Sequence, residues 1–163
     1  MIEIKSSSSN RADMAAAISL AIMRWQDATQ AYDEAVGARL GLNAAERQCL
    51  GLLHGGAQSA GAIAVATGLT PAAVTALIDR LEARGLLTRT RSLEDRRKVV
   101  IEATDLTRQL SARYYGAIAR DGERLIASFS DAELAAVQRF ITAALDLQRE
   151  QLARLKAEAP QAG

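Results

Sequence analysis

The sequence predicts a mainly α-helical protein with one small β-hairpin. Hydrophobic residues make up 49% of the 163 positions but aromatic residues only 4%, so the core must consist of Ala, Leu, Ile and Val, a composition that favours helices. Apolar residues also recur at three- and four-residue spacing in successive segments, which is typical of helices that bury one face. One segment near position 100 is instead rich in β-branched residues, which favour strands.

The clearest helix begins at Thr70. Its hydroxyl can accept a hydrogen bond from a free backbone N–H, and Pro71 fits the first helical position, where its missing donor costs nothing. Gly85 ends this helix, whose apolar stripe consists of Val74, Leu77, Ile78 and Leu81. A shorter helical pattern covers residues 59 to 67, and Gly68 suits a tight turn between the two. The pair predicts a helix-turn-helix.

A charged hairpin is predicted directly after this helix. Residues 86 to 91 and 98 to 103 are of strand type, and the sequence SLEDRR lies between them. From Arg80 to Lys98 there are seven basic and three acidic residues, a local net charge of +4 in a chain whose total is +1. A local positive surface suits phosphate. A solvated charged face is the alternative, but the coincidence with a helix-turn-helix and a hairpin favours DNA contact.

Long helices are predicted on either side of this region. Residues 1 to 10 end in four serines and are expected to form a disordered leader without function. An apolar seam predicts one long helix within residues 11 to 40. Residues 105 to 157 are expected to form two more helices, and residues 158 to 163 a flexible tail.

Two further helix starts have the pattern of a capping box. Asn43 with Glu46, and Ser130 with Glu133, combine a polar N-cap with a glutamate three positions later. The first opens a helix that ends at Gly55 and would support the helix-turn-helix. The second opens the last helix, whose apolar face outlasts what a small domain could cover. We therefore expect the first and last helices to pack against their mates in a second subunit, about a two-fold axis.

The helix-turn-helix ending in RLEARGLL, the hairpin with EDRR at its tip and the threonine at its exit together resemble the winged helix-turn-helix of the MarR family of bacterial transcription regulators. The resemblance covers most of the chain, and the Asp-x-Arg tip is its specific part. It implies a winged helix-turn-helix DNA-binding domain over residues 41 to 104 and a helical dimerisation region formed by residues 11 to 40 and 105 to 157. It also implies a homodimeric repressor. Thr107 stands where that family usually has a glycine, which leaves the path into the next helix open.

Such a dimer would present two recognition helices to half-sites about 10 bp apart, which predicts an inverted-repeat operator. Thr75 and Arg80 can hydrogen-bond base edges, whereas the neighbouring alanines can only meet thymine methyl groups. Arg96 and Arg97 suit a narrow minor groove, and Asp95 is assigned to orienting Arg97. The full set of predicted DNA-binding residues is Thr70, Ala72, Ala73, Thr75, Ala76, Arg80, Arg91, Asp95, Arg96, Arg97 and Lys98.

The resemblance also implies a small aromatic or anionic effector that fills a cleft between the dimer helices and the winged domain. Filling such a cleft would favour a spacing of the recognition helices that no longer fits the half-sites. The predicted lining residues are Trp25, Tyr32, Arg47, His54 and Tyr114. A place in the dimer core is the alternative for Trp25 and Tyr32.

The residue inventory favours binding over catalysis. One histidine and one cysteine provide no catalytic triad and no metal-ligand set, and no Gly-rich phosphate loop is found. We therefore expect no enzymatic activity, metal or cofactor, and His54 should serve structure at a helix end. Cys49 is expected to be a buried, inert thiol rather than an oxidant sensor, and a single cysteine fits a cytoplasmic protein.

Two partner questions follow from the same inventory. No apolar run reaches the about 20 residues that a membrane span needs, so no membrane is expected as a partner. The alternative to DNA binding is a winged-helix module that binds another protein and no duplex DNA. The double arginine at the hairpin tip argues against that alternative.

Overall fold

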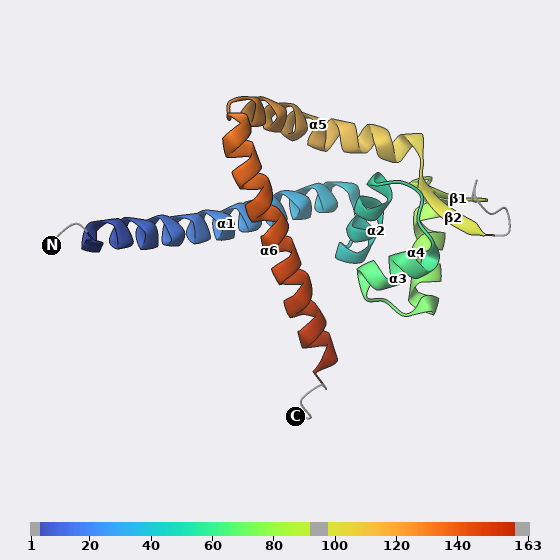
Figure 1. The fold of residues 1–163 in the computed structure, drawn as a ribbon. Helices are drawn as coiled ribbons and strands as arrows, with labels where there is room; N and C mark the ends of the chain where they lie inside the picture. Colours follow the sequence, from blue (N-terminus) through green and yellow to red (C-terminus); the bar gives the residue numbers. More distant parts are fainter. Residues whose placement is uncertain (1–3, 92–97, 159–163) are drawn as a thin grey trace. The chain divides into compact units, whose positions relative to one another are not determined.

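The computed structural model describes residues 4–91 and 98–158 of the chain (Figure 1). The elements in order are α1 (Ile4–Leu40), α2 (Ala44–His54), α3 (Ala60–Thr67), α4 (Pro71–Ala83), β1 (Leu87–Arg91), β2 (Val99–Ala103), α5 (Asp105–Ala127) and α6 (Asp131–Ala157). They divide into two compact units, the first ending at Tyr114 and the second beginning at Tyr115. The fold is therefore mainly α-helical with one hairpin, as predicted.

The core of the first unit lies among α2, α3, α4 and the hairpin, which cluster together in Figure 1. All four residues of the predicted α4 stripe are buried. They pack in one cluster with Cys49, Leu53, Ile63, Leu86, Leu87 and Ile101. The helix-turn-helix is thus held against the hairpin by aliphatic contacts, which leaves the opposite side of α4 open to solvent.

Local signals in the sequence set the ends of these helices. Both capping boxes form, at Asn43 with Glu46 and at Ser130 with Glu133. The Thr70 hydroxyl accepts from the backbone N–H of Ala73, with Pro71 next in the first helical position. After α4, Gly85 adopts a φ of 68°, a left-handed conformation that side chains disfavour. These starts and stops were predicted and are confirmed.

The hairpin is antiparallel, with Leu87 opposite Ala103 and Arg91 opposite Val99. A third segment joins it, because Gln58 and Ile101 exchange two backbone hydrogen bonds of 2.9 and 2.8 Å. This bridge attaches the loop before α3 to β2 and was not predicted. The predicted hairpin tip, residues 92 to 97, lies outside the described residues.

The predicted leader is wrong for residues 4 to 10, because α1 begins at Ile4 and includes the four serines. Once a helix is nucleated, each further residue adds a hydrogen bond. Serine costs at most about 0.7 kcal/mol relative to alanine in a helix, so polar residues alone do not stop it. The chain has no proline or glycine before Gly37 that would. At the other end, α6 stops at Ala157, and residues 159 to 163 of the predicted tail lie outside the described residues.

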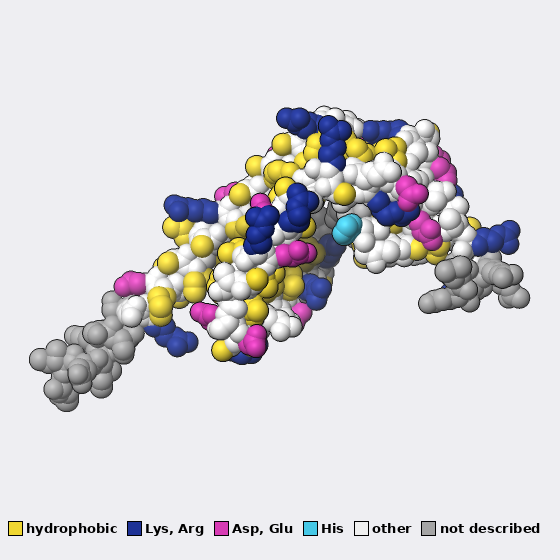
Figure 2. Space-filling view, turned by 90° about the horizontal axis from the view of Figure 1, so that it is seen from above, with side chains coloured by type: hydrophobic (Ala, Val, Ile, Leu, Met, Phe, Trp, Pro, Cys, Tyr) yellow, Lys and Arg dark blue, Asp and Glu magenta, His cyan; other side chains and the backbone are white. Residues whose placement is uncertain are grey.

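The second unit consists of the end of α5 and all of α6, and no residue of α6 is buried. Apart from the half-buried Leu134, the large hydrophobic side chains of α6 are exposed by between 39% and 66%, among them Val137, Ile141, Leu145, Leu152 and Leu155. In the first unit, α1 is similar, with Ile18 51% and Trp25 64% exposed. Figure 2 shows many hydrophobic side chains open on the surface of the long helices. Apolar surface on this scale is seldom left exposed to water by a folded protein.

Within the described ranges, no single helix is both long and apolar enough to cross a membrane. α3 and α4 together meet the length and composition, but they are bent by 106° at the break between them. Their large apolar residues belong mostly to the buried core described above.

Candidate nucleic-acid interface

α4 presents a face of small and polar side chains away from the core. Ala73 is half-buried, and the exposed residues of this face are Ala72, Thr75, Ala76, Asp79 and Arg80. These residues therefore face away from the core, apart from the partial cover of Ala73. The small side chains let the helix backbone approach a partner closely, as a helix in the DNA major groove does.

The hydroxyls of Thr70 and Thr75 both form hydrogen bonds with the backbone of α4. Thr70 is exposed, and its hydroxyl caps α4. The Thr75 hydroxyl donates to the carbonyl of Pro71 at 3.1 Å. Its oxygen keeps its lone pairs and can still accept from the amino group of adenine or cytosine.

Arg80 is held by a buried carboxylate from another helix. Its Nε lies 3.2 Å from Oε1 of Glu46 in α2, and the Glu46 side chain is 8% exposed against 54% for Arg80. The other carboxylate oxygen of Glu46 accepts from the backbone N–H of Asn43 in the capping box. The guanidinium of Arg80 is therefore held at Nε by Glu46, while the side chain remains about half exposed.

Arg89 of β1 is also paired, here with two carboxylates of α4. It donates to Asp79 and to Glu82, and its backbone N–H donates to Glu82 as well. The hydrogen bond to Asp79, together with the negative charge of Glu82, raises the pKa of Arg89. These pairs fix the hairpin to α4 and largely neutralise the arginine.

Arg84, at the end of α4, is the third arginine that is paired within the fold. Its guanidinium donates to the carbonyl oxygens of Leu40 at 2.6 Å and Gly41 at 3.0 Å, where α1 ends. Three of the seven basic residues counted in the sequence therefore serve contacts within the fold. The local excess of +4 overstates the charge available to DNA, because the count omitted Glu46 and the pairing.

Arg91 and Lys98, at the open end of the two strands, are both exposed. They flank the predicted tip, and Asp95, Arg96 and Arg97 lie outside the described residues. The described part of the candidate interface thus consists of one face of α4 and the outer end of the hairpin.

The structure brings together only some of the predicted effector residues. The Tyr32 hydroxyl of α1 donates to the carbonyl of Tyr114 in α5 at 2.5 Å. Arg47 donates to the Asp33 carbonyl at 3.0 Å and lies across Gly37, so it ties α2 to α1 near that pair. By contrast, Trp25 lies about two turns earlier on α1, with its side chain mostly exposed.

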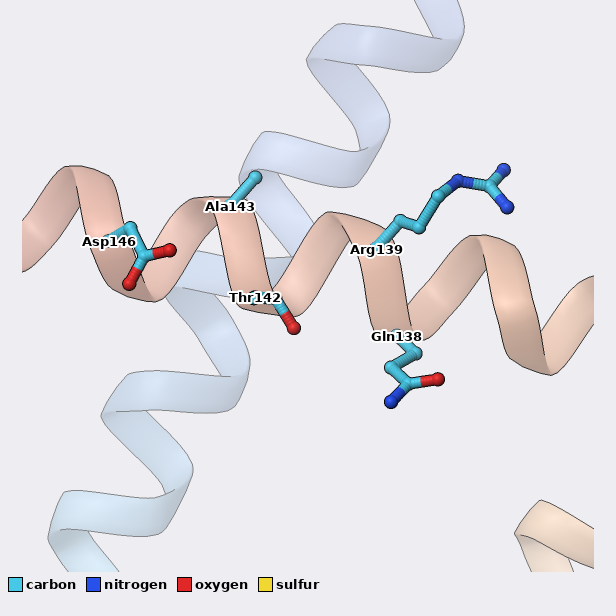
Figure 3. Close-up of a pocket in the computed structure, with 5 residues that line it drawn as sticks. All are labelled: Gln138, Arg139, Thr142, Ala143 and Asp146. Atoms are coloured by element: carbon cyan, nitrogen blue, oxygen red, sulfur yellow. The ribbon is translucent and has the colours of Figure 1, made fainter.

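His54 is exposed at the end of α2 and makes no described contact with the tyrosine pair. A shallow depression elsewhere is lined by residues of α6 alone: Gln138, Arg139, Thr142, Ala143 and Asp146 (Figure 3). None of the predicted effector residues lines it. One helix face encloses too little of a small molecule to form a binding site.

Cys49 is fully buried, and burial together with the nearby Glu46 charge raises its pKa to about 11. Its thiol therefore stays protonated at neutral pH, which agrees with the prediction of an inert thiol. Among the described residues, no three His, Cys, Asp or Glu side chains group together as metal ligands would.

Comparison with known proteins agrees with this geometry. The sequence model of the MarR family matches residues 40–98, which include the helix-turn-helix and β1 and end just before β2. YcgE, an uncharacterized HTH-type transcriptional regulator of Bacillus subtilis (strain 168), is 30% identical over 129 residues, which span 78% of this chain and 84% of YcgE. The chain belongs to the MarR family. It is accordingly a DNA-binding transcriptional regulator with a winged-helix fold.

Solved structures share the MarR fold at lower identity. A mutant of MepR from a multidrug resistant clinical isolate of S. aureus is 18% identical, with a TM-score of 0.62 over 80% of this chain and 96% of MepR. Another S. aureus MepR mutant, bound to an oligodeoxyribonucleotide, is 21% identical, with a TM-score of 0.50 over 79% and 95%. CouR from Rhodococcus jostii RHA1 bound to p-coumaroyl-CoA is 23% identical, with a TM-score of 0.52 over 78% and 90%.

Four contacts of this MarR-family chain were missed from sequence. Glu46 was interpreted only as a capping residue, although it also holds Arg80. The sequence around Gln58 has no strand pattern, so its pairing with Ile101 of β2 was not predicted. Thr107, in place of the usual glycine, donates its hydroxyl to the Leu86 carbonyl, while Thr104 donates to the Gly85 carbonyl. These two threonines attach the start of α5 to the turn between α4 and β1, which shows how the chain enters α5 with a threonine at position 107.

Proposed function

We propose that this protein is a homodimeric, ligand-responsive repressor that binds an inverted-repeat operator in duplex DNA. The observation that carries the DNA part is the exposed α4 face of small residues, with Arg80 anchored at its edge. Arg91 and Lys98 extend that face with positive charge at the hairpin. A regulator of this form reads bases with α4 and gains sequence-independent affinity from phosphate contacts.

The exposed apolar faces support the homodimer. α1 and α6 leave large hydrophobic residues open to water in the single chain. Apolar area gains about 25 cal/mol per Å² when it is buried, so a second copy that covers these faces is favoured. A two-fold dimer uses the same surface on both subunits and presents two copies of α4, which match two half-sites.

The Tyr32–Tyr114 pair and Arg47 support the response to an effector. They combine aromatic surface with one guanidinium close to the junction of α1, α2 and α5. An aromatic or anionic molecule suits these groups, and CouR binds p-coumaroyl-CoA, which is both. A ligand that favours a different spacing of the two α4 helices would lower operator occupancy, and release from the operator would end repression.

Selection from random duplex DNA at physiological salt tests the proposal. We expect the purified protein to enrich an inverted repeat whose half-site centres lie about 10 bp apart. Enrichment of a single unrepeated half-site would contradict the dimer. Failure to enrich any duplex would contradict DNA recognition and favour the protein-interaction module.

The effector part has its own test. Trp25 is the single tryptophan and lies on α1, so its fluorescence can report changes around that helix. We expect salicylate, as an aromatic carboxylate probe, to release the protein from the selected DNA and to shift this fluorescence. Tyr32→Phe should weaken both effects, and release that is indifferent to Tyr32→Phe would exclude this region as the binding site.

A further inference from the structure

Glu46 is a buried carboxylate that belongs to two structures at once, the capping box of α2 and the ion pair with Arg80 of α4. We propose that Glu46 is a positioning residue for sequence recognition, which sets the direction in which Arg80 points toward a base pair. The proposal rests on the proposed reading of DNA by α4. It assigns a share of the base specificity to a side chain that is itself only 8% exposed.

The geometry holds the carboxylate still. Oε2 of Glu46 accepts from the Asn43 N–H at 3.0 Å, while the Glu46 N–H donates to the Asn43 side chain at 2.9 Å. The remaining oxygen, Oε1, faces Arg80. The capping box fixes both the backbone and the carboxylate of Glu46. The carboxylate therefore keeps its position and restricts the orientations that Arg80 can adopt.

The contact is made at the one guanidinium nitrogen that base reading does not need. Arginine reads guanine with two parallel hydrogen bonds, and its terminal nitrogens supply a suitable pair of donors. Glu46 engages Nε, which leaves the two terminal nitrogens of Arg80 without a described partner and on a side chain that is about half exposed. Holding a long, flexible side chain before DNA arrives reduces the ordering that binding would otherwise require.

Arg89 of β1, which is paired with two carboxylates of α4, shows the contrasting arrangement. Its two terminal nitrogens are occupied by Asp79 and Glu82, so it has little capacity left for DNA. The difference lies in which nitrogens the carboxylates take. Arg80 is therefore the arginine of this face that is both oriented and available.

A positioning role of Glu46 and a purely electrostatic role predict different changes in DNA binding when its carboxylate is neutralised. Removal of a negative charge near the interface should leave affinity for random DNA unchanged or raise it, because phosphate repulsion falls. Loss of orientation should instead reduce discrimination at the base pair that Arg80 reads. Glu46→Gln separates the two, since glutamine also satisfies a capping box.

The experiment measures binding of wild type, Glu46→Gln, Arg80→Ala and the double variant to the selected repeat, to its single-base variants and to random duplex. We expect Arg80→Ala to lose discrimination at one position of each half-site by about tenfold or more, as for a bidentate contact. Glu46→Gln should lose about threefold or more at the same position, with random-duplex affinity no lower than wild type. The double variant should match Arg80→Ala, because Glu46 acts through Arg80.

Glu133→Gln is the matched control. Glu133 forms the same capping box at the start of α6 but has no basic partner there among the described residues. It should change no base preference, and thermal melting should show that every variant is folded. If Glu46→Gln fails to fold, Arg80→Lys serves instead, since it keeps the charge and should lose the discrimination while it keeps the salt dependence.

The outcomes separate this proposal from the proposed function. No enriched duplex with wild type would remove DNA recognition itself, and unchanged preference in Arg80→Ala would remove Arg80 as a reader. If Arg80→Ala behaves as expected, the positioning role is overturned by any of three results: unchanged preference in Glu46→Gln, an equal loss on specific and random DNA, or a further change in the double variant.

Discussion

At the scale of the residue, three arginines near α4 differ in what their partners leave available. Arg80 is anchored at Nε by one carboxylate, and Arg89 lies between two. Arg84 donates to backbone carbonyls at the end of α1. Identical side chains therefore differ in the hydrogen-bond donors that they have left for DNA, depending on which groups the fold places beside each one.

Cys49 gives a residue-scale prediction about pH. Its pKa is raised from 9.0 to about 11 in the folded protein, so both states are protonated well below pH 9. Between pH 9 and 11 the unfolded state loses the thiol proton and the folded state keeps it. The free energy of unfolding should therefore fall as pH rises through this window, with Cys49 contributing up to about 1.4 kcal/mol per pH unit.

Chemical denaturation at several pH values between 8 and 11 checks this expectation. Cys49→Ala should show a shallower decline than wild type, because tyrosine and lysine titration remain in both. At pH 8, iodoacetamide should label native wild type far more slowly than the unfolded chain. Equal slopes in the two proteins would show that the thiol titrates normally in the folded state.

At the scale of the element, the end of α4 holds the corner between α1 and α2. Arg84 donates to two carbonyls of that corner, and Arg80 contacts it through Glu46. Arg47 fixes the other side by its bond to the Asp33 carbonyl. A shift of α1 relative to this corner would therefore act directly on the helix proposed to read DNA.

Arg84→Ala tests the strength of that attachment. The last carbonyls of α1 would lose two charge-assisted donors at the negative end of the helix dipole. We expect a loss of about 1–2 kcal/mol in the free energy of unfolding, measured by urea denaturation. Arg139→Ala, an arginine on α6 without a described partner, should change it by less than about 0.5 kcal/mol. A similar loss in both variants would mean that Arg84 adds nothing specific.

The hairpin gives a second element-scale prediction. Arg91 lies at its open end and is expected to contact phosphate. Arg91→Ala should weaken binding to all duplex sequences alike and make the slope of log K against log salt shallower by about one unit. A salt titration on specific and random DNA measures both effects, with Arg139→Ala as the charge-matched control. A change confined to one base position would instead make Arg91 a base reader.

At the scale of the whole molecule, the chain exposes more apolar surface than a stable monomer should. Every residue of α6 is at least partly exposed. In a single chain these hydrophobic side chains would favour association without a defined partner, which natural proteins avoid. A symmetric dimer removes the problem and also supplies the second recognition helix.

Leu145→Glu tests the dimer. Leu145 is 51% exposed on α6, and a carboxylate at a buried apolar interface is strongly unfavourable. We expect light scattering after gel filtration to show a monomer and binding to the inverted repeat to fall by at least about tenfold. Gln138→Glu adds the same charge to the same helix, in the shallow depression of Figure 3, and should remain dimeric. A dimeric Leu145→Glu would move the interface away from this face.

The helix ends and the hairpin were predictable because their causes are local. A threonine before a proline, two capping boxes and a left-handed glycine act within four residues, so the sequence displays them directly. The burial of the α4 stripe followed from its spacing. The start of α1 was misjudged because serines permit a helix without signalling one.

What the sequence alone determined about this protein is its elements, its family resemblance and the outward face of α4. Only the tertiary structure decided which charges that face offers, because pairing joins residues far apart in the chain: Glu46 with Arg80, and the end of α1 with Arg84. The charge count of +4 treated each arginine as independent. Electrostatic interactions depend on distance in space rather than along the sequence, so the sequence could locate the positive segment but could not show which of its arginines the fold had already engaged.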